Sequence, residues 1–255
     1  MIEFQGVHKA FGPKQVLRGF TLAIPDGETT VVLGYSGSGK SVALKHVVGL
    51  IEPDAGRVVV DGRVVHELDR EALAELRRTI GYVFQFAALF DSLTVAENLA
   101  LGLRRQGLDE ATIRRRVGES LELVDLAGAE GKYPAELSGG MRKRVGIARA
   151  IALRPRYILY DEPTAGLDPV TSAVIDRLMV RARRELGVTG VVVTHDLRSC
   201  LTVGTRVAML HDGVVRQVGT VDEVWASRDP VVRQFIEGRP DEEPAMEAAV
   251  RPSAR

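Results

Sequence analysis

The residues with the clearest capacity for chemistry form a glycine-rich stretch, Gly34-Tyr35-Ser36-Gly37-Ser38-Gly39-Lys40-Ser41. This stretch fits the phosphate-binding pattern G-x-x-x-x-G-K-[ST]. Its glycines allow backbone N–H groups to turn inward around phosphate oxygens, and a helix that starts there points its positive end at the same place. In such a loop we expect Lys40 to reach the β- and γ-phosphates of a nucleotide and the Ser41 hydroxyl to bind Mg²⁺.

The flanks of this loop support the same interpretation. An apolar, β-branched run from Thr29 to Leu33 leads into it, and a run with helical character from Val42 to Leu50 leaves it. The pattern is meaningful only in this strand–loop–helix setting, because a glycine-rich turn before a helix is otherwise common. The sequence therefore predicts a nucleotide-binding site at Lys40.

A second chemically capable group follows another apolar run. The residues Tyr157-Ile158-Leu159-Tyr160 predict a buried strand, and Asp161 and Glu162 come directly after it. A carboxylate at the C-terminal edge of a strand is suited to bind Mg²⁺ beside the phosphate loop. The next carboxylate is well placed to polarise an attacking water. We expect Asp161 to act on the metal and Glu162 on the water.

A third group, Ser138-Gly139-Gly140, opens a predicted helix. By the same backbone and dipole argument, it is another anion site. One nucleotide in one chain does not need two phosphate cradles, but two chains arranged head to tail do. Each chain would then offer its second cradle to the nucleotide of the other.

The composition is that of a globular protein whose positive and negative charges balance, so it has no strong net electrostatic field. There are 34 Lys plus Arg and 34 Asp plus Glu, so no global charge recruits nucleic acid or anionic lipid. The short basic run Arg114-Arg115-Arg116 indicates a solvated helix face. The single cysteine, Cys200, excludes an internal disulfide and is expected to pack on a helix face. No signal peptide and no apolar stretch of ~20 residues is visible, so a membrane role would come through a partner.

The elements that must position these groups alternate between strands and helices. Short strands are predicted early in the chain, with Gly12-Pro13 as a turn, and Asp61-Gly62 predicts a type I′ hairpin. Asp69 is expected to cap a helix that ends near Arg78. Further strands and helices are predicted at these ranges: 2–7, 20–24, 57–60, 63–65, 80–84, 157–160, 189–194, 207–210 and 214–218 as strands, and 139–153 and 169–186 as helices.

Between about 95 and 124 the apolar residues recur at helical spacing and interrupt this alternation. We interpret the segment as part of a helical subdomain, about 95–152, inserted into a nucleotide-binding core. The stretch 239–255 is rich in Pro, Glu and Ala and is expected to be a mobile tail, although it could instead reach a neighbouring subunit.

Taken in order, these motifs resemble those of the ATP-binding cassette (ABC) ATPases over residues 1–238. The matching pieces are the phosphate loop, Gln85, LSGGM at 137–141, YILYDE at 157–162, Ala165-Gly166-Leu167-Asp168 and Val193-Thr194-His195-Asp196. The resemblance implies an α/β P-loop NTPase fold, with a RecA-like core, an antiparallel β subdomain and an inserted helical subdomain. It also implies ATP hydrolysis coupled to transport.

The resemblance further implies roles for single residues. Phe11 would stack on adenine, although it could also pack within a hairpin, and the loop from Gly34 through Ser36, Gly37, Ser38 and Gly39 to Val42 would hold the phosphates. Gln85 would touch Mg²⁺ or the water and sense the membrane partner. Ser138, Gly139 and Gly140 would bind the γ-phosphate of the opposite subunit's ATP, Asp168 would bridge the dimer, and His195 would hold the γ-phosphate. Met141 replaces the usual glutamine of the signature, which leaves its effect on ribose or partner contacts open.

The residues within and around these motifs are similar to those of one branch of the family, the ATPases of the mammalian-cell-entry (MCE) type lipid transporters. This branch includes the maintenance-of-lipid-asymmetry system. The similar stretches are 39–42, 84–95, 137–144 and 227–235. This resemblance implies a homodimer at the cytoplasmic face of the inner membrane, a multi-spanning permease, an MCE-domain protein, in some members a STAS-domain subunit, and phospholipid or another hydrophobic molecule as cargo.

Three other functions fit part of the sequence. An importer ATPase for amino acids or other polar solutes would keep every ATPase residue. A cytosolic ABC protein acting on nucleic acid or ribosomes usually carries two cassettes or a long insertion, which this balanced, compact chain lacks. A regulatory cassette without catalysis is disfavoured by the intact Lys40, Asp161, Glu162 and His195.

Overall fold

The computed structural model describes residues 1–239. Its centre is a six-stranded sheet in the order β10-β9-β3-β8-β7-β6, in which the strands from β9 to β6 are parallel and β10 is antiparallel to β9. Its strands are β3 (Thr29–Leu33), β6 (Ile80–Val83), β7 (Tyr157–Asp161), β8 (Thr189–Thr194), β9 (Arg206–His211) and β10 (Val214–Gly219). Every residue of β3, β7 and β8 is buried, as their continuous apolar runs predict.

A second, antiparallel sheet has the order β2-β1-β4-β5. Its strands are β1 (Ile2–Phe11), β2 (Lys14–Ile24), β4 (Ala55–Val60) and β5 (Arg63–Val64). The turn between β4 and β5 has Asp61 at φ 50° and Gly62 at φ 78°, which confirms the predicted type I′ geometry.

The first two strands were predicted too short. They pair from Ile2–Ile24 to Phe11–Lys14, with register shifts along the way. The apolar alternation stops where the hairpin arm becomes exposed, so only backbone pairing extends it there, and the pattern could not reveal it. In consequence Phe11 is the last residue of β1 and not part of a loop.

The helices are α1 (Lys40–Val47), α2 (Arg70–Arg78), α3 (Val95–Arg105), α4 (Glu110–Leu123), α5 (Gly139–Ala152), α6 (Pro169–Leu186), α7 (Leu197–Val203), α8 (Val221–Trp225) and α9 (Pro230–Glu237). Two 3₁₀ turns cover Val65–Glu67 and Pro134–Glu136. The predicted cap Asp69 accepts a hydrogen bond from the Ala72 N–H at 2.8 Å. None of the helices in residues 1–239 combines the length and apolar character needed to cross a bilayer.

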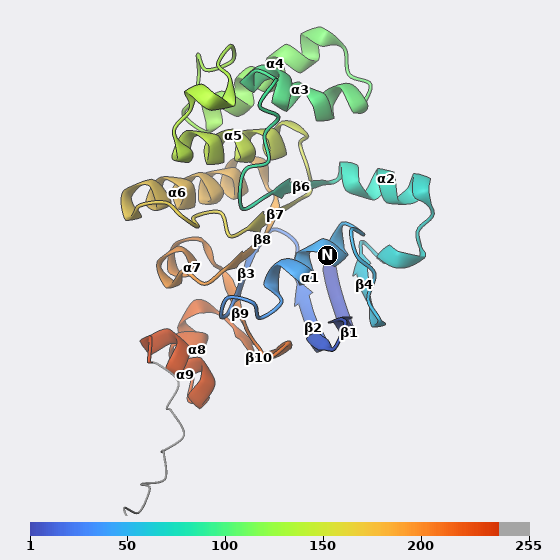
Figure 1. The fold of residues 1–255 in the computed structure, drawn as a ribbon, viewed down its shortest axis with the longest axis vertical. Coiled ribbons are helices and arrows are strands. Elements are labelled where there is room, and N and C mark those ends of the chain that lie inside the picture. Colours follow the sequence, from blue (N-terminus) through green and yellow to red (C-terminus); the bar gives the residue numbers. More distant parts are fainter. Residues whose placement is uncertain (240–255) are drawn as a thin grey trace, which may run out of the picture.

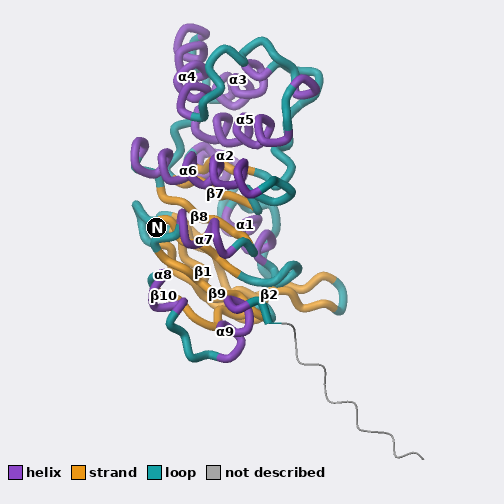
Figure 2. The backbone as a smooth tube through the Cα atoms, turned by 90° about the vertical axis from the view of Figure 1, so that its left-hand side faces the viewer, coloured by secondary structure: helices purple, strands orange, loops and turns teal. Residues whose placement is uncertain are grey.

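The central sheet separates two hydrophobic cores, and neighbouring residues on β3 illustrate the division. Val32 packs in the core shared with α1 and the antiparallel sheet, whereas Val31 packs in the core shared with α3 to α7. Figure 1 shows α3, α4 and α5 gathered at one end of the molecule and α8 and α9 at the other, and the perpendicular view in Figure 2 agrees. Cys200 is fully buried on α7, as predicted. The tail prediction falls on 240–255, which lie outside the described residues.

Candidate active site

The phosphate loop connects β3 to α1 and depends on glycine at two close approaches. A Cβ at Gly34 would lie 2.3 Å from the Leu210 carbonyl oxygen, and one at Gly39 would lie 2.9 Å from the Leu17 side chain. Gly39 is also the N-cap of α1 with φ 104°, in the region that favours glycine. The glycines therefore let the loop pass tightly between strand ends while the helix starts beneath it.

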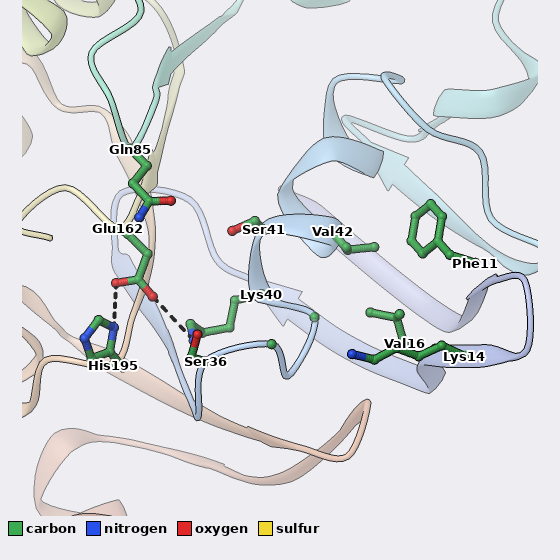
Figure 3. A pocket seen from close by; sticks show the side chains of 12 residues that line it. Phe11, Lys14, Val16, Ser36, Lys40, Ser41, Val42, Gln85, Glu162 and His195 are labelled. Carbon is green, nitrogen blue, oxygen red and sulfur yellow. Dashed lines mark hydrogen bonds and ion pairs between the residues drawn. The ribbon is translucent and has the colours of Figure 1, made fainter.

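This loop forms one wall of a cavity of about 410 Å³, shown in Figure 3. Ten of the predicted site residues line it: Phe11, Ser36, Gly37, Gly39, Lys40, Ser41, Val42, Gln85, Glu162 and His195. Gly34 and Ser38 belong to the loop but lie behind its surface, where the Ser38 side chain faces Gly34. Phe11 lies at one side of the cavity and the Glu162–His195 pair at the other, with Lys40 between them.

Lys40 is buried at the centre of this arrangement, with 5% of its side chain exposed. Its Nζ donates to the carbonyl oxygens of Gly34 at 2.7 Å and Tyr35 at 2.9 Å. It also lies 3.4 Å from Oε1 of Glu162. Burial lowers the pKa of Lys40, and the Glu162 carboxylate opposes that shift. The ammonium group is thus held in the loop at the place where phosphate oxygens would enter.

Glu162 directly follows β7 and His195 directly follows β8, and the C-terminal ends of these neighbouring parallel strands meet at one edge of the sheet. The Nδ1 atom of His195 lies 3.0 Å from Oε2 of Glu162. Glu162 adopts φ 46°, and its N–H donates to the Val193 carbonyl oxygen at 3.0 Å. A non-glycine residue in this region is strained by about 1–3 kcal/mol, and such strain concentrates at functional sites.

Asp161, the last residue of β7, lies behind Ser41. The Ser41 hydroxyl donates to Oδ1 of Asp161 at 2.6 Å, and the Tyr82 hydroxyl donates to Oδ2 at 3.1 Å. Burial and the Asp161 charge raise the pKa of Tyr82, which keeps it a donor. The described residues hold no cluster of three or more His, Cys, Asp or Glu side chains suited to a metal. Hydroxyl and carboxylate oxygens in small number fit Mg²⁺, which takes its remaining ligands from phosphates and water.

Gln85 follows β6 and begins a loop with an unusual backbone. Ala87 has φ 59° and Ala88 φ 48°. The Arg149 guanidinium on α5 donates to both of their carbonyl oxygens, at 2.7 and 2.6 Å. Beyond Gln85 the loop exposes 85% of Phe86 and 57% of Phe90. The loop is therefore fixed from inside and presents aromatic surface outside.

The signature residues lie elsewhere. A second cavity, of about 590 Å³, is lined by residues that include Ser138, Gly139, Gly140, Met141, Arg144, Gly166, Asp168 and Thr171, and it shares no lining residue with the first. Ser138 is the N-cap of α5, and Asp168 is the N-cap of α6, where it accepts from the N–H groups of Val170 and Thr171. Hydrogen bonds from Thr171 and Val170 lower the pKa of Asp168. Within one chain, Ser138, Gly139, Gly140 and Asp168 are thus not brought to the phosphate loop.

The sequence reasoning missed two residues that line the first cavity and one that lies behind it. Lys14 and Val16 lie beside Phe11 at one side of it (Figure 3). Their spacing of two on β2 places both on one strand face, which could have indicated them once that strand was predicted at full length. Tyr82 was also missed, because it belongs to β6, a neighbouring strand, and only the pairing of β6 with β7 brings it to Asp161.

Comparison with known proteins gives a consistent result. A family described as "ABC transporter" matches residues 17–165. The chain is 42% identical over 239 residues to a protein from Mycobacterium tuberculosis (strain ATCC 25618 / H37Rv), "Probable ribonucleotide transport ATP-binding protein mkl", and the match covers 93% of this chain and 67% of that protein. It is 38% identical over 247 residues to "Methionine import ATP-binding protein MetN" of Brucella abortus (strain 2308), covering 96% and 67%.

Solved structures show the same relationship. The "Dimeric structure of a post-hydrolysis state of the ATP-binding cassette MJ0796 bound to ADP and Pi" matches with a TM-score of 0.79 and 36% identity, covering 87% of this chain and 99% of that one. The structure of cbiO1 from Clostridium perfringens, described as part of the ABC transporter complex cbiONQ, matches with a TM-score of 0.81 and 31% identity, covering 93% and 94%.

Proposed function

Because the chain belongs to the ABC transporter ATPases, and is therefore the ATP-hydrolysing motor of such a transporter, we propose that two copies form a head-to-tail dimer that drives lipid transport. In this proposal residues 1–238 are one ATPase domain, with a helical subdomain at about 95–152. The similar cassette MJ0796 is dimeric in a post-hydrolysis state with ADP and phosphate bound, which supports the dimeric arrangement.

ATP would bind along the first cavity. Adenine would stack on Phe11, and the phosphates would lie on the N–H groups of the loop from Gly34 to Val42 and on Lys40. Ser41, Asp161 and Gln85 would hold Mg²⁺, which supplies charge neutralisation to the β- and γ-phosphates when it is bound. The hydrogen bond between Ser41 and Asp161 places two of these oxygens side by side.

The observation that carries hydrolysis is the position of the Glu162 carboxylate between Lys40 and His195. Its two oxygens lie 3.4 Å from the Lys40 ammonium and 3.0 Å from the His195 ring. A carboxylate there can accept a proton from a water that attacks the γ-phosphorus, while Lys40 and His195 stabilise the phosphoryl charge. Catalysis would consist of positioning and electrostatics, as in other phosphoryl transfers.

The second cavity would complete the partner's site. Ser138, Gly139 and Gly140 at the start of α5 offer N–H groups and a hydroxyl to the γ-phosphate of the other subunit's ATP. Asp168, fixed as the cap of α6, would bridge the two chains. A cavity of about 590 Å³ that contains such a cradle but none of Lys40, Ser41, Asp161 or Glu162 suits this role.

The proposed cargo, phospholipid or another hydrophobic molecule, is inferred from the amino-acid sequence of the motifs. The stretches 84–95 and 137–144 resemble MCE-type lipid transporter ATPases. The proposed partners are a multi-spanning permease, an MCE-domain protein and, in some systems, a STAS-domain subunit, with the ATPase peripheral at the cytoplasmic face of the inner membrane and no nucleic acid involved. The exposed Phe86 and Phe90 give a permease an apolar surface next to Gln85. The names of the mkl and MetN relatives, ribonucleotide transport and methionine import, favour a polar-solute importer as the second candidate.

A tagged pull-down from gently solubilised native membranes, followed by mass spectrometry, separates these candidates. If the cargo is a lipid, we expect the pull-down to recover a multi-spanning permease together with an MCE-domain protein. Recovery of a permease with a soluble solute-binding protein would instead move the function to polar-solute import. A Glu162→Gln variant stabilises the closed dimer in ATP in either case, so it serves as the bait that retains the assembled complex.

A further inference from the structure

One buried cation takes no part in the chemistry described above. Lys143 lies on α5, the helix that begins at the signature residues, and only 7% of it is exposed. Its Nζ lies 3.4 Å from the backbone carbonyl oxygen of Glu162. Lysine is almost never fully buried without a partner, so this placement needs a physical reason.

Stability is a poor reason. Burial lowers the pKa of Lys143, and the charge of the Glu162 carboxylate opposes that shift only in part, so the charged form is disfavoured where it lies. A single long contact to a neutral carbonyl does not offset the removal of an ammonium group from water. An apolar side chain of similar length would fill the same space at lower cost.

The backbone at Glu162 offers a better reason. This residue is held at φ 46°. Its carbonyl oxygen accepts from the Ala165 N–H at 3.2 Å and faces the Lys143 ammonium. The Val193 carbonyl oxygen already holds the N–H of Glu162, so fixing the Glu162 carbonyl as well fixes the Cα–Cβ direction from which the side chain reaches Lys40 and His195. A cation that attracts the carbonyl oxygen therefore stabilises the strained backbone conformation.

We propose that Lys143 is a positioning residue that holds the Glu162 backbone in its left-handed conformation and so aims the carboxylate at the attacking water. The inference rests on the proposed role of Glu162 as the base. Lys143 also lies on α5, the helix that starts at Ser138 and Gly140. In the proposed dimer, α5 would therefore bind the partner's phosphate at its start and position Glu162 of its own chain through Lys143.

The test compares Lys143→Met with the wild-type protein. Met keeps the length and the apolar stem but removes the charge and the donor. We expect kcat for ATP hydrolysis to fall about 10- to 100-fold, because small misplacements of a catalytic group have effects of this size. KM for ATP should stay within about twofold, and Tm should not fall, because a buried charge has been removed. Lys143→Gln, which keeps an N–H donor, should lose less activity than Lys143→Met, and equal losses would count against the proposal.

A matched control and a double-mutant cycle exclude a purely structural role. Arg105→Met removes an exposed cation of α3 that lines neither cavity, and it should leave kcat within about twofold. In a Glu162→Gln background, Lys143→Met should have no further effect on single-turnover hydrolysis, because Lys143 acts through the carboxylate.

Two results would overturn the inference: a Lys143→Met kcat within twofold of wild type, or an equal loss in the Glu162→Gln background. Neither would affect the proposed function. That proposal would fail separately, if the wild-type protein did not hydrolyse ATP or if Glu162→Gln turned over normally.

Discussion

The two cavities of this chain are both built around the start of a helix, yet they are chemically unequal. The phosphate-loop cavity joins the N-terminus of α1 to the C-terminal ends of parallel strands. It is lined by Lys40, Ser41, Glu162 and His195, and Asp161 lies behind Ser41 within hydrogen-bond distance of it. The signature cavity joins the N-termini of α5 and α6, and its anion-binding groups are backbone N–H groups, the Ser138 hydroxyl and the lining arginines Arg144 and Arg177.

In the proposed head-to-tail dimer, this difference divides the work between two copies of the chain. Strand ends deliver charged side chains to one edge of a sheet, so that edge can bind and react with a phosphate. A helix N-terminus delivers oriented N–H dipoles, and together with the arginines beside it these recognise an anion without changing it. The signature cavity is therefore suited to bind an anion in a site that another chain completes, and not to catalyse a reaction by itself.

The largest expected effect is at the reactive cavity. Glu162→Gln removes the carboxylate that is proposed to accept the water's proton but keeps its shape and its contact with His195. Hydrolysis should fall by about 10³-fold, within the range for loss of a general base. ATP binding should persist, so the variant should elute as a dimer in ATP and as a monomer in ADP. Phosphate release and size-exclusion chromatography measure the two. Normal turnover of this variant would remove Glu162 from the reaction.

A smaller but more discriminating effect is expected at the signature cavity. Gly140→Asp places a carboxylate where the partner's phosphate would lie, with its Cβ 2.5 Å from the present position of the Thr171 methyl group. Hydrolysis should fall by about 100-fold through like-charge repulsion, whereas binding of a fluorescent ATP analogue should stay within about twofold. Lys40→Ala should weaken ATP binding itself, because it removes the cation proposed to meet the phosphates, and it should therefore also abolish hydrolysis.

Mixing these two inactive variants tests the head-to-tail arrangement directly. In a mixed dimer, one composite site has both defects and the other has neither, because each site combines the phosphate loop of one chain with the signature of the other. An equal mixture should recover about a quarter of wild-type activity if the subunits exchange freely. A mixture that stays inactive although mixed dimers form would show that the two cavities do not meet across the interface.

At the end of the phosphate-loop cavity where adenine would lie, a substitution should change ATP binding and not the rate of hydrolysis. Phe11 is 49% exposed at the tip of its hairpin, so its removal leaves the core intact. Phe11→Ala should raise KM for ATP about 5- to 150-fold, the range expected for loss of one stacking contact, and leave kcat unchanged. Phe11→Trp should restore KM, which steady-state kinetics would show. A fall in kcat without a change in KM would place Phe11 outside the binding surface.

Sequence was most informative where a local pattern and its chemistry coincide. The phosphate loop needs glycine at Gly34 and Gly39 for steric reasons that are visible in the pattern itself. The runs before Gly34 and Asp161 predicted the buried strands because a sheet covered on both faces uses continuous apolar residues. The helix at 169–186 was predicted at its observed bounds, since Pro169 starts it and Gly187 ends it.

The pattern failed where placement depends on distant pairing. The exposed arm of β1 and β2 has no buried face, so Phe11 was expected in a loop. Tyr82 reaches Asp161 only through the pairing of β6 with β7, and Lys143 reaches Glu162 only because α5 packs beside that strand end. No spacing rule encodes such contacts, because their sequence separation is set by the fold.

The smallest expected effect concerns the contact between α6, which begins at the signature cavity, and α7. Asp176 lies on α6, the helix that Asp168 caps, and it is buried with Oδ2 accepting from the Ser199 hydroxyl on α7 at 3.1 Å. Burial raises the pKa of Asp176 to about 6; the Ser199 hydrogen bond and the nearby Arg177 oppose the shift, and the Asp196 charge adds to it.

Because the folded pKa lies above the ordinary value of 3.8, the folded state binds the proton more tightly. The resulting stability is complete below about pH 4 and is lost as the pH rises through about 6. Asp176→Asn removes this dependence, so its free energy of unfolding relative to wild type should be more favourable at pH 8 than at pH 4.5, by about 2 kcal/mol. Urea unfolding at the two pH values measures this difference. An offset that is the same at both would show that Asp176 is already ionised throughout, and that the contact between α6 and α7 is held as a charged hydrogen bond.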